Sequence, residues 1–264
     1  MASDIHPTAI VDPSAQLADG VQVGPFCVVG PNVSVGEGTV FGPHCVVDGH
    51  TRIGSHNTFY RFCSVGGMPQ DKKYAGEATS LEIGDRNMFR EYVTLNTGTV
   101  QDVGVTRIGS DNWVMAYVHV AHDCQVGNQT ILANGVQMGG HVHIGDWAIV
   151  GGLAAIHQFG KVGPHAMVGG SSAVHMDVPP YVMSSGNPCV PVGINAEGLK
   201  RRGFSPEAVA AVRDAYKSLY RRGLSLEQAK EQMRDRQQSD AEAKDPLQVM
   251  LDFLAASNRG IIRP

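Results

Sequence analysis

The sequence has little charge, few aromatic residues and no long apolar run. Asp, Glu, Lys and Arg make up 17% of its 264 residues, and Phe, Trp and Tyr only 6%. A formal net charge of −4 disfavours a nucleic-acid-binding protein, which is normally basic. No segment approaches the ~20 apolar residues of a membrane-spanning helix, and the first residues lack the cationic start and apolar stretch of a signal peptide. We therefore expect a cytoplasmic protein with no transmembrane segment and no nucleic-acid partner.

The five cysteines form no CxxC pair, so neither a disulfide scaffold nor a zinc ribbon is expected. Cys27, Cys45 and Cys63 instead recur at a constant interval of eighteen positions. Glycine is abundant, with 32 residues, which exceeds the usual share of about 7%. Many glycines and few aromatics indicate many tight corners around a core of small aliphatic side chains.

A period of six residues runs through most of the chain. Every sixth residue is apolar over positions 5–65, again over 83–95, and then over 108–174. A second column of mostly small residues follows four positions behind the first. Three short strands, one per period, make a triangular coil of eighteen residues, and such coils stack in parallel. The sequence therefore predicts an all-β parallel β-helix over residues 1–192, with the three spaced cysteines as small buried side chains in one interior column.

Two polar stretches interrupt the period, and the end of the chain abandons it. Residues 68–80 and 97–107 are predicted to be loops inserted into the coils. A solenoid has no internal need of such loops, so we expect them to be functional. Helical sequence follows, with predicted N-caps at Ser205 and Ser225. We predict a C-terminal α-helical domain over residues 193–264 that closes the open end of the β-helix.

Three of the eleven histidines recur at intervals close to one coil. His122, His141 and His157 are separated by nineteen and then sixteen positions, so we expect them to lie roughly above one another beside the loops. Asp123 follows His122 and can fix its tautomer and orientation. A His–carboxylate pair of this kind is what general-base catalysis needs.

A zinc site is the competing interpretation of the histidines. Trimeric β-helices of the γ-class carbonic anhydrases carry zinc on three histidines, but a His-x4-His pair usually marks that site, and this cluster lacks one. His44, His50 and His56 fall in consecutive repeats, so they face three sides of the prism and are expected to be ordinary surface residues. We therefore expect no metal site. A purely structural β-helix is the non-enzymatic alternative, which the clustered histidines and the loops disfavour.

Seven segments together resemble one family of enzymes. They are QDKKYAGE (70–77), EIGDRN (82–87), HVAHDCQVGN (119–128), GGHVHIGD (139–146), IHQF (156–159), DVPPYV (177–182) and GLKRRGFS (198–205). These segments are very similar to UDP-N-acetylglucosamine acyltransferases, the cytoplasmic O-acyltransferases that begin lipid A synthesis. The resemblance covers essentially the whole chain. It implies left-handed coils, a homotrimer with active sites between subunits, and cofactor-free transfer of an (R)-3-hydroxyacyl group from acyl carrier protein to the 3-hydroxyl of UDP-N-acetylglucosamine.

The resemblance also implies a role for each matching residue. His122 is the general base, Asp123 orients it, and the backbone N–H of Gly140 stabilises the tetrahedral oxyanion. Two adjacent arginines suit a diphosphate, because guanidinium groups pair well with phosphate oxygens. The residues that match substrate-binding positions are Gln70, Asp71, Lys73, His119, His141, His157, Gln158, Asn195, Glu197, Arg201 and Arg202.

Departures from the family pattern leave substrate details open. Close relatives read His-Arg-Gly where this chain reads Asn96-Thr97-Gly98. Some relatives acylate a 3-amino group, so an amide-forming reaction is the alternative. Gly170 matches a position that limits acyl length, and glycine there leaves space for a longer chain. Pro188, however, replaces the histidine expected at the far end of that groove.

The acyl donor implied by the resemblance is an acidic carrier protein, which needs a basic surface on its partner. We expect Lys72, Lys73, Arg86 and Arg90 to contribute to that surface. The alternative donor is coenzyme A, which many hexapeptide sugar acyltransferases use.

Overall fold

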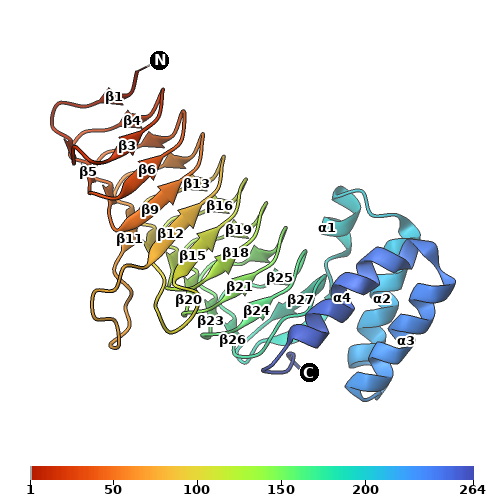
Figure 1. Ribbon diagram of the computed structural model, residues 1–264. Helices are drawn as coiled ribbons and strands as arrows, with labels where there is room; N and C mark the ends of the chain where they lie inside the picture. The colour runs from red at the N-terminus through yellow and green to blue at the C-terminus, as the bar shows by residue number, and fades with distance from the viewer. Residues whose placement is uncertain (1) are drawn as a thin grey trace.

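The computed structural model describes residues 2–264, in which short strands wind into a long prism with helices packed at one end (Figure 1). The strands form three sheets, one on each face, and strands within β1–β26 pair only in parallel. Partners lie eighteen positions apart where no loop intervenes, as Val28 pairs with Val46. The predicted parallel β-helix is therefore confirmed.

Faces A, B and C are defined by the strands that compose them. Face A contains β1 (Asp4–Ile5), β4 (Gln22–Val23), β7 (Val40–Phe41), β10 (Thr58–Phe59), β13 (Met88–Phe89), β16 (Trp113–Val114), β19 (Ile131–Leu132), β22 (Ile149–Val150), β25 (Met167–Val168), β27 (Val182–Ser185) and β28 (Val190–Ile194). Face B contains β2 (Ile10–Val11), β5 (Val28–Val29), β8 (Val46–Val47), β11 (Ser64–Gly67), β14 (Thr94–Asn96), β17 (His119–Val120), β20 (Gln137–Met138), β23 (Ala155–Ile156) and β26 (Ala173–Val174). Face C contains β3 (Gln16–Leu17), β6 (Val33–Val35), β9 (His50–Ile53), β12 (Ser80–Ile83), β15 (Val105–Ile108), β18 (Gln125–Val126), β21 (His143–Ile144) and β24 (Lys161–Val162).

The interior of the prism is built from the two columns of the six-residue period. The larger apolar residues are buried from Val23 onward. Cys27, Cys45 and Cys63 are buried as predicted, and each thiol donates to a corner carbonyl, the first to that of Gly42 at 3.0 Å. Many corners hold a residue with positive φ, a conformation that costs most residues roughly 1–2 kcal/mol. The prism tolerates it because each coil hydrogen-bonds to the next.

Both inserted loops leave the prism at the corner between faces B and C. The first spans residues 68–79 and the second 97–104, since β12 and β15 begin at Ser80 and Val105. Ser80 pairs with His50, so the first insertion adds two whole periods to the eighteen positions of a coil. Val105 pairs with Ser80, so the second insertion adds one period and one further residue. That further residue explains the shift of register seen in the sequence.

Helices cap the C-terminal end, as predicted. They are α1 (Ala196–Arg201), α2 (Pro206–Tyr220), α3 (Leu226–Ser239), the 3-10 turn η1 (Ala241–Ala243) and α4 (Lys244–Ala256). Ser205 and Ser225 are N-caps, and each side chain accepts a backbone N–H of the first turn. The predicted division between residues 192 and 193 falls inside β28, which continues to Ile194 because it pairs antiparallel with β27. Within residues 2–264, every helix is too short or too polar to span a bilayer.

Candidate active site

A polar cavity of about 850 Å³ opens at the corner between faces B and C. Residues of both loops line it together with corner residues of three successive coils. The lining residues are Gln70, Asp71, Lys72, Lys73, Gln101, Asp102, His122, His141, Gln158 and Phe159. Six of the predicted site residues therefore come together here: three from the first loop, the two corner histidines and Gln158.

The corner residues are arranged in two columns, each with one residue per coil. His122, Gly140 and Gln158 form one column, and Asp123, His141 and Phe159 form the other. The columns are held in register because the His141 N–H donates to the His122 carbonyl at 3.0 Å and the Phe159 N–H to the Gly140 carbonyl at 2.9 Å. The His141 ring stacks on Phe159 with centroids 4.2 Å apart and 5° between the planes.

The predicted stack of His122, His141 and His157 is therefore wrong in register. Intervals of nineteen and sixteen positions differ from a coil of eighteen, so the three histidines occupy three different corner positions. The His157 side chain lies outside the cavity lining: its Nδ1 is 3.0 Å from the Gln158 carbonyl, and its ring is 6.1 Å from that of His175.

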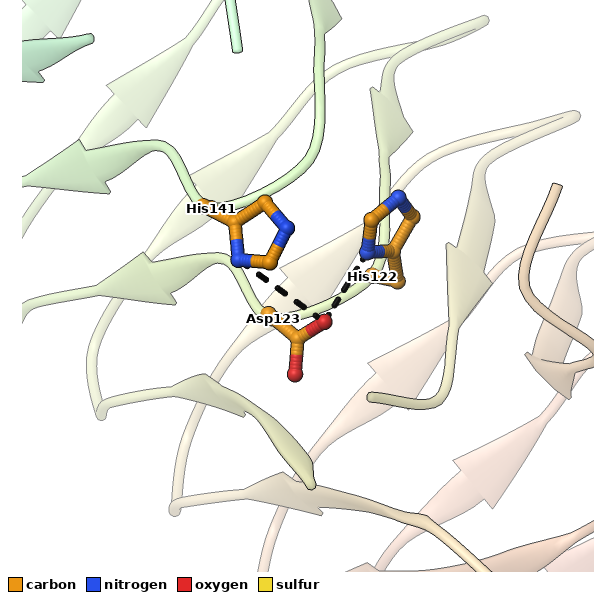
Figure 2. Close-up of side chains that lie close together, drawn as sticks. All are labelled: His122, Asp123 and His141. Atoms are coloured by element: carbon orange, nitrogen blue, oxygen red, sulfur yellow. Dashed lines mark hydrogen bonds and ion pairs between the residues drawn. The ribbon is translucent and has the colours of Figure 1, made fainter. Parts of the chain in front are cut away.

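The predicted His122–Asp123 pair is present. Nδ1 of His122 is 2.9 Å from Oδ2 of Asp123, whose buried carboxylate also accepts the Thr99 N–H at 3.0 Å and the Thr99 hydroxyl at 2.7 Å. An ionised carboxylate only accepts hydrogen bonds, so it holds the imidazole proton on Nδ1. Nε2 of His122 is left with its lone pair and points away from Asp123 (Figure 2). This geometry suits a general base.

Gly140 lies directly against the His122 ring. A Cβ at this position would be 2.4 Å from Cε1 and 2.6 Å from Nε2 of His122, so only glycine leaves the ring where it is. Within residues 2–264, the Gly140 N–H donates to no other group. It is therefore available as the predicted oxyanion donor.

His119 lies beside this pair on face B. Its Nδ1 is 2.7 Å from the Thr94 hydroxyl. Burial and then the nearby His122 lower the pKa of His119, so its ring is neutral at neutral pH and can either accept or donate one hydrogen bond through Nε2.

His122, Asp123 and His141 also offer three ligand atoms within 4.8 Å of one another, the spacing a metal ion needs. Those groups are engaged in hydrogen bonds, however. Asp123 accepts from His122 and Thr99, and Nδ1 of His141 is 2.6 Å from Oδ2 of Asp102. A cation bound through the hydrogen-bonded atoms would have to replace these bonds, and the absence of a metal site stays a prediction.

Four of the five residues predicted to bind the nucleotide lie near a different corner, between faces C and A: Asn195, Glu197, Arg201 and Arg202. The fifth, Gln158, lines the cavity. The guanidinium of Arg202, just after α1, is 5.1 Å from the centroid of the Trp147 ring and 3.4 Å from Nδ1 of His165. Asn195 donates to the His165 carbonyl at 3.0 Å and caps α1. Burial and then the Arg202 charge lower the pKa of His165 to about 4. On the exposed surface of α1, Glu197 pairs with Lys200, and Arg201 is also exposed.

The two positions expected to set acyl length are both exposed. Gly170 is at the corner between faces A and B, where a Cβ would lie 3.2 Å from the Gly152 carbonyl oxygen. Pro188 is in the turn between β27 and β28. Both positions lie across face B from the cavity.

The four basic residues expected to face a carrier protein do not form one surface. Lys72 and Lys73 line the cavity. Arg86 is at the corner between faces C and A, where it pairs with Asp111 through two contacts of 2.8 Å. Arg90 is at the corner between faces A and B and pairs with its neighbour Glu91 at 3.1 Å. Consecutive repeats place these residues at different corners of one chain, so their contribution to a carrier-protein surface stays a prediction.

Sequence reasoning missed Thr99, Asp102 and Phe159. Phe159 was recoverable, because it follows His141 by one coil and Asp123 by two. Thr99 and Asp102 lie in an insertion without a period, so no sequence signal relates them to the corners they reach.

Comparison with known proteins identifies the class first. Residues 14–49 and 106–140 match the family of bacterial transferase hexapeptide repeats. Residues 177–262 match the family described as UDP N-acetylglucosamine O-acyltransferase, domain 2. Together with the His–carboxylate pair at a coil corner, these matches define a hexapeptide-repeat acyltransferase.

Full-length relatives identify the family. The chain is 59% identical to an acyl-[acyl-carrier-protein]–UDP-N-acetylglucosamine O-acyltransferase of Burkholderia multivorans and 55% identical to that of Janthinobacterium sp. strain Marseille, each over 98% of this chain and 99% of the relative. It is similar to LpxA of Acinetobacter baumannii (TM-score 0.94, 50% identity, 98% and 99% of the two chains) and to UDP-N-acetylglucosamine acyltransferase of Francisella novicida (TM-score 0.95, 41% identity, 98% and 94%). The chain belongs to the family of UDP-N-acetylglucosamine O-acyltransferases. The prediction of a left-handed β-helix with a helical C-terminal part is thereby confirmed.

Proposed function

We propose that this protein transfers an (R)-3-hydroxyacyl chain from acyl carrier protein to the 3-position of the glucosamine of UDP-N-acetylglucosamine, the first step of lipid A biosynthesis. The observation that carries the proposal is the His122–Asp123 pair in the cavity of a full-length member of this family. The reaction belongs in the cytoplasm, where its carrier protein and nucleotide sugar are found, and requires no cofactor.

In the proposed mechanism, Nε2 of His122 takes the proton of the 3-hydroxyl as that oxygen attacks the thioester carbonyl. Asp123 stabilises the imidazolium that forms. The oxyanion of the tetrahedral intermediate accepts the N–H of Gly140. Its collapse breaks the C–S bond, and the imidazolium returns the proton to the departing thiolate of the carrier. No residue becomes acylated, and Cys124 is buried in the interior, where it is inert.

The cavity suits the sugar of the acceptor. Asp71 and His141 are proposed to contact it, with Gln70, Lys73, His119 and His157 as further binding residues around the corner. Gln158, Asn195, Glu197, Arg201 and Arg202 are proposed to bind the nucleotide, with the two arginines on the diphosphate.

A homotrimer would bring the sugar site and the nucleotide site together. In one chain the cavity is at the corner between faces B and C, whereas Arg202 is at the corner between faces C and A. The strands of face B carry no Asp, Glu, Lys or Arg and those of face A only Asp4, whereas Arg52 and Glu82 are examples of several charges on face C. We therefore propose that faces A and B lie between subunits, so that Arg202 of one subunit approaches the cavity of the next.

An aromatic ridge supports this arrangement. It consists of stacked rings along the corner between faces A and B, with successive centroids 4.9–5.0 Å apart. Its members are Phe26, His44, Phe62, Tyr92 and Tyr117. Phe26 and Tyr117 are 57% and 60% exposed in the single chain, an extent of exposed aromatic surface that is typical of an interface. His44 is exposed in the single chain, as expected, and its ring also stacks between those of Phe26 and Phe62.

Acyl length is proposed to be set across face B. A chain that starts at the cavity and crosses this face reaches the corner that holds Gly170, with Pro188 near its far end. Glycine at 170 supports a longer acyl chain than a residue with a side chain would.

The proposal is tested by incubating the protein with UDP-N-acetylglucosamine and 3-hydroxyacyl carrier proteins of several chain lengths. Formation of acylated nucleotide sugar is expected, and His122→Ala should lose at least about 100-fold in turnover. The 3-amino analogue of the sugar is assayed in parallel, because Asn96 differs from the histidine of close relatives. Wild-type turnover by His122→Ala contradicts the mechanism, and acyl transfer from coenzyme A alone contradicts the proposed donor.

A further inference from the structure

A second histidine–carboxylate pair lies in the cavity, and the proposed mechanism does not use its carboxylate. Oδ2 of Asp102 is 2.6 Å from Nδ1 of His141, although the two residues are 39 positions apart in sequence. Asp102 belongs to the second loop and His141 to a coil corner. The pair stands next to His122, whose ring lies edge-on to that of His141 with centroids 5.0 Å apart.

Asp102 is the carboxylate that determines which nitrogen of His141 carries the proton. Asp123, the other candidate, is 3.9 Å from Nδ1, beyond hydrogen-bond distance. An ionised carboxylate only accepts hydrogen bonds, so when the ring carries one proton, Asp102 keeps that proton on Nδ1 and leaves a lone pair on Nε2. The stack on Phe159 keeps the ring from tilting, and the bond to Asp102 keeps it from flipping.

We propose that Asp102 is a positioning residue that makes Nε2 of His141 a hydrogen-bond acceptor for the sugar. The group it recognises is a donor, a hydroxyl or an amide N–H. This inference rests on the proposed function, in which His141 contacts the sugar. Without Asp102 the ring can carry its proton on Nε2. The Nε2–H group would then be a donor that faces the donor of the sugar, and neither group would have an acceptor.

The second loop thereby serves both histidines. Through Thr99 it donates two hydrogen bonds to the carboxylate that orients His122, and through Asp102 it accepts one from His141. Gly98 allows the two ends of this loop to approach each other closely, since a Cβ there would lie 2.2 Å from the Val105 nitrogen. Asp102 acts through His141 and not through His122, and this distinction can be measured.

A double-mutant cycle separates the two routes. We compare Asp102→Asn, His141→Ala and the double variant, and measure kcat and the KM for UDP-N-acetylglucosamine at saturating acyl carrier protein. Asp102→Asn is expected to raise this KM about tenfold and to change kcat less than about threefold, because a bound donor left without its acceptor typically weakens binding by about this factor. In the His141→Ala background the same substitution should change KM less than about twofold, since coupled residues are not additive.

Asp235→Asn is the matched control, because Asp235 is exposed on α3 and its substitution changes the net charge equally. Both kinetic constants should stay at wild-type values. An equal rise of KM with and without His141, or no rise in either background, overturns the proposal.

A second measurement needs no activity. ¹⁵N NMR of histidine-labelled protein should show His141 protonated on Nδ1 in the wild type and shifted towards Nε2–H in Asp102→Asn. An unchanged His141 tautomer in that variant overturns the role of Asp102. If the wild type transfers no acyl group to either acceptor, the proposed function fails, and the tautomer measurement still decides whether Asp102 controls His141.

Discussion

Replacing Gly140 with alanine should displace the His122 ring and leave the other features of the site unchanged. The added Cβ would lie 2.4 Å from Cε1 and 2.6 Å from Nε2 of His122, whereas ordinary contacts are 3.4–4 Å. The ring must therefore retreat by about 1 Å, a displacement that can lower a rate about 10²-fold when it misplaces a catalytic group. Because alanine keeps the backbone N–H at this position, oxyanion stabilisation by that group is retained.

The fold should tolerate this substitution. Gly140 has no positive φ, and the atoms that the Cβ meets belong to a side chain that can rotate away. The midpoint of thermal unfolding is expected to fall by less than about 4 °C, which corresponds to roughly 1 kcal/mol in a chain of this size. Loss of activity without loss of stability would thus locate the effect at His122.

The assay is the initial rate of acylated nucleotide sugar formation at saturating substrates. Gly140→Ala should lower kcat about 100-fold and have no further effect in a His122→Ala background. Gly193→Ala is the matched control, since a Cβ added to Gly193 meets no neighbour within 4 Å and its φ is not positive, and kcat of this variant should not change. If Gly140→Ala keeps more than a third of wild-type turnover, the ring is not held where the reaction needs it and the reasoning is refuted.

Three further predictions follow from burial and surface character. Asp123→Ala leaves the Thr99 N–H and hydroxyl and the His122 ring without their acceptor, so the free energy of unfolding should fall by about 1–3 kcal/mol in urea denaturation; an unchanged urea midpoint would contradict this. Burial raises the pKa of Cys124 to about 12, so its thiolate fraction at pH 8 is only about 10⁻⁴ and iodoacetamide should modify it in unfolded protein alone; labelling of Cys124 in the folded protein at pH 8 would show that the interior is open. Tyr92→Glu places a charge in the aromatic ridge and should convert the proposed trimer to smaller species in light scattering, whereas a trimer of unchanged stability would place the subunit interface elsewhere.

The period of six was sufficient to predict the prism because it constrains every coil in the same way. An apolar residue at each sixth position gives three such residues per coil. All three are buried only if each of the three strands of the coil directs its apolar side chain into the prism. The exceptions are at the N-terminal end, where Ile5 is 41% exposed and Val11 and Leu17 are only partly buried. Within residues 2–264 no coil packs beneath the first one, whereas at the other end helices provide that cover. The helix N-caps at Ser205 and Ser225 were equally predictable, since they depend on local sequence.

The candidate site was predictable only where the period reaches it. His122 and Asp123 are neighbours in sequence, and counting one coil onward leads to Gly140 and His141. The approximate intervals of nineteen and sixteen misplaced His157 because a shift of one or two positions at a corner turns a side chain to another side. Asp102 could not be placed at all. Its loop is an insertion whose path depends on contacts with Asp123 and His141, and those contacts exist only after folding.

The site is built from corner side chains that are not part of the hydrophobic core. These side chains can therefore be chosen for a particular reaction without disturbing the prism. Inward residues are constrained by burial, so Val120, Met138 and Ile156 are all apolar. The corner residue three positions after each of them has positive φ and points outward from the prism. Equivalent corner residues of successive coils are about 4.8 Å apart, because the coils are hydrogen-bonded to one another as strands of a sheet. Side chains in such a column face the same direction at contact distance, which is why His141 stacks on Phe159 and approaches Asp123. Substitution in these columns changes the chemistry without changing the core, so the corner columns and the loops that cover them, and not the repeat, are where the specificity of this enzyme is determined.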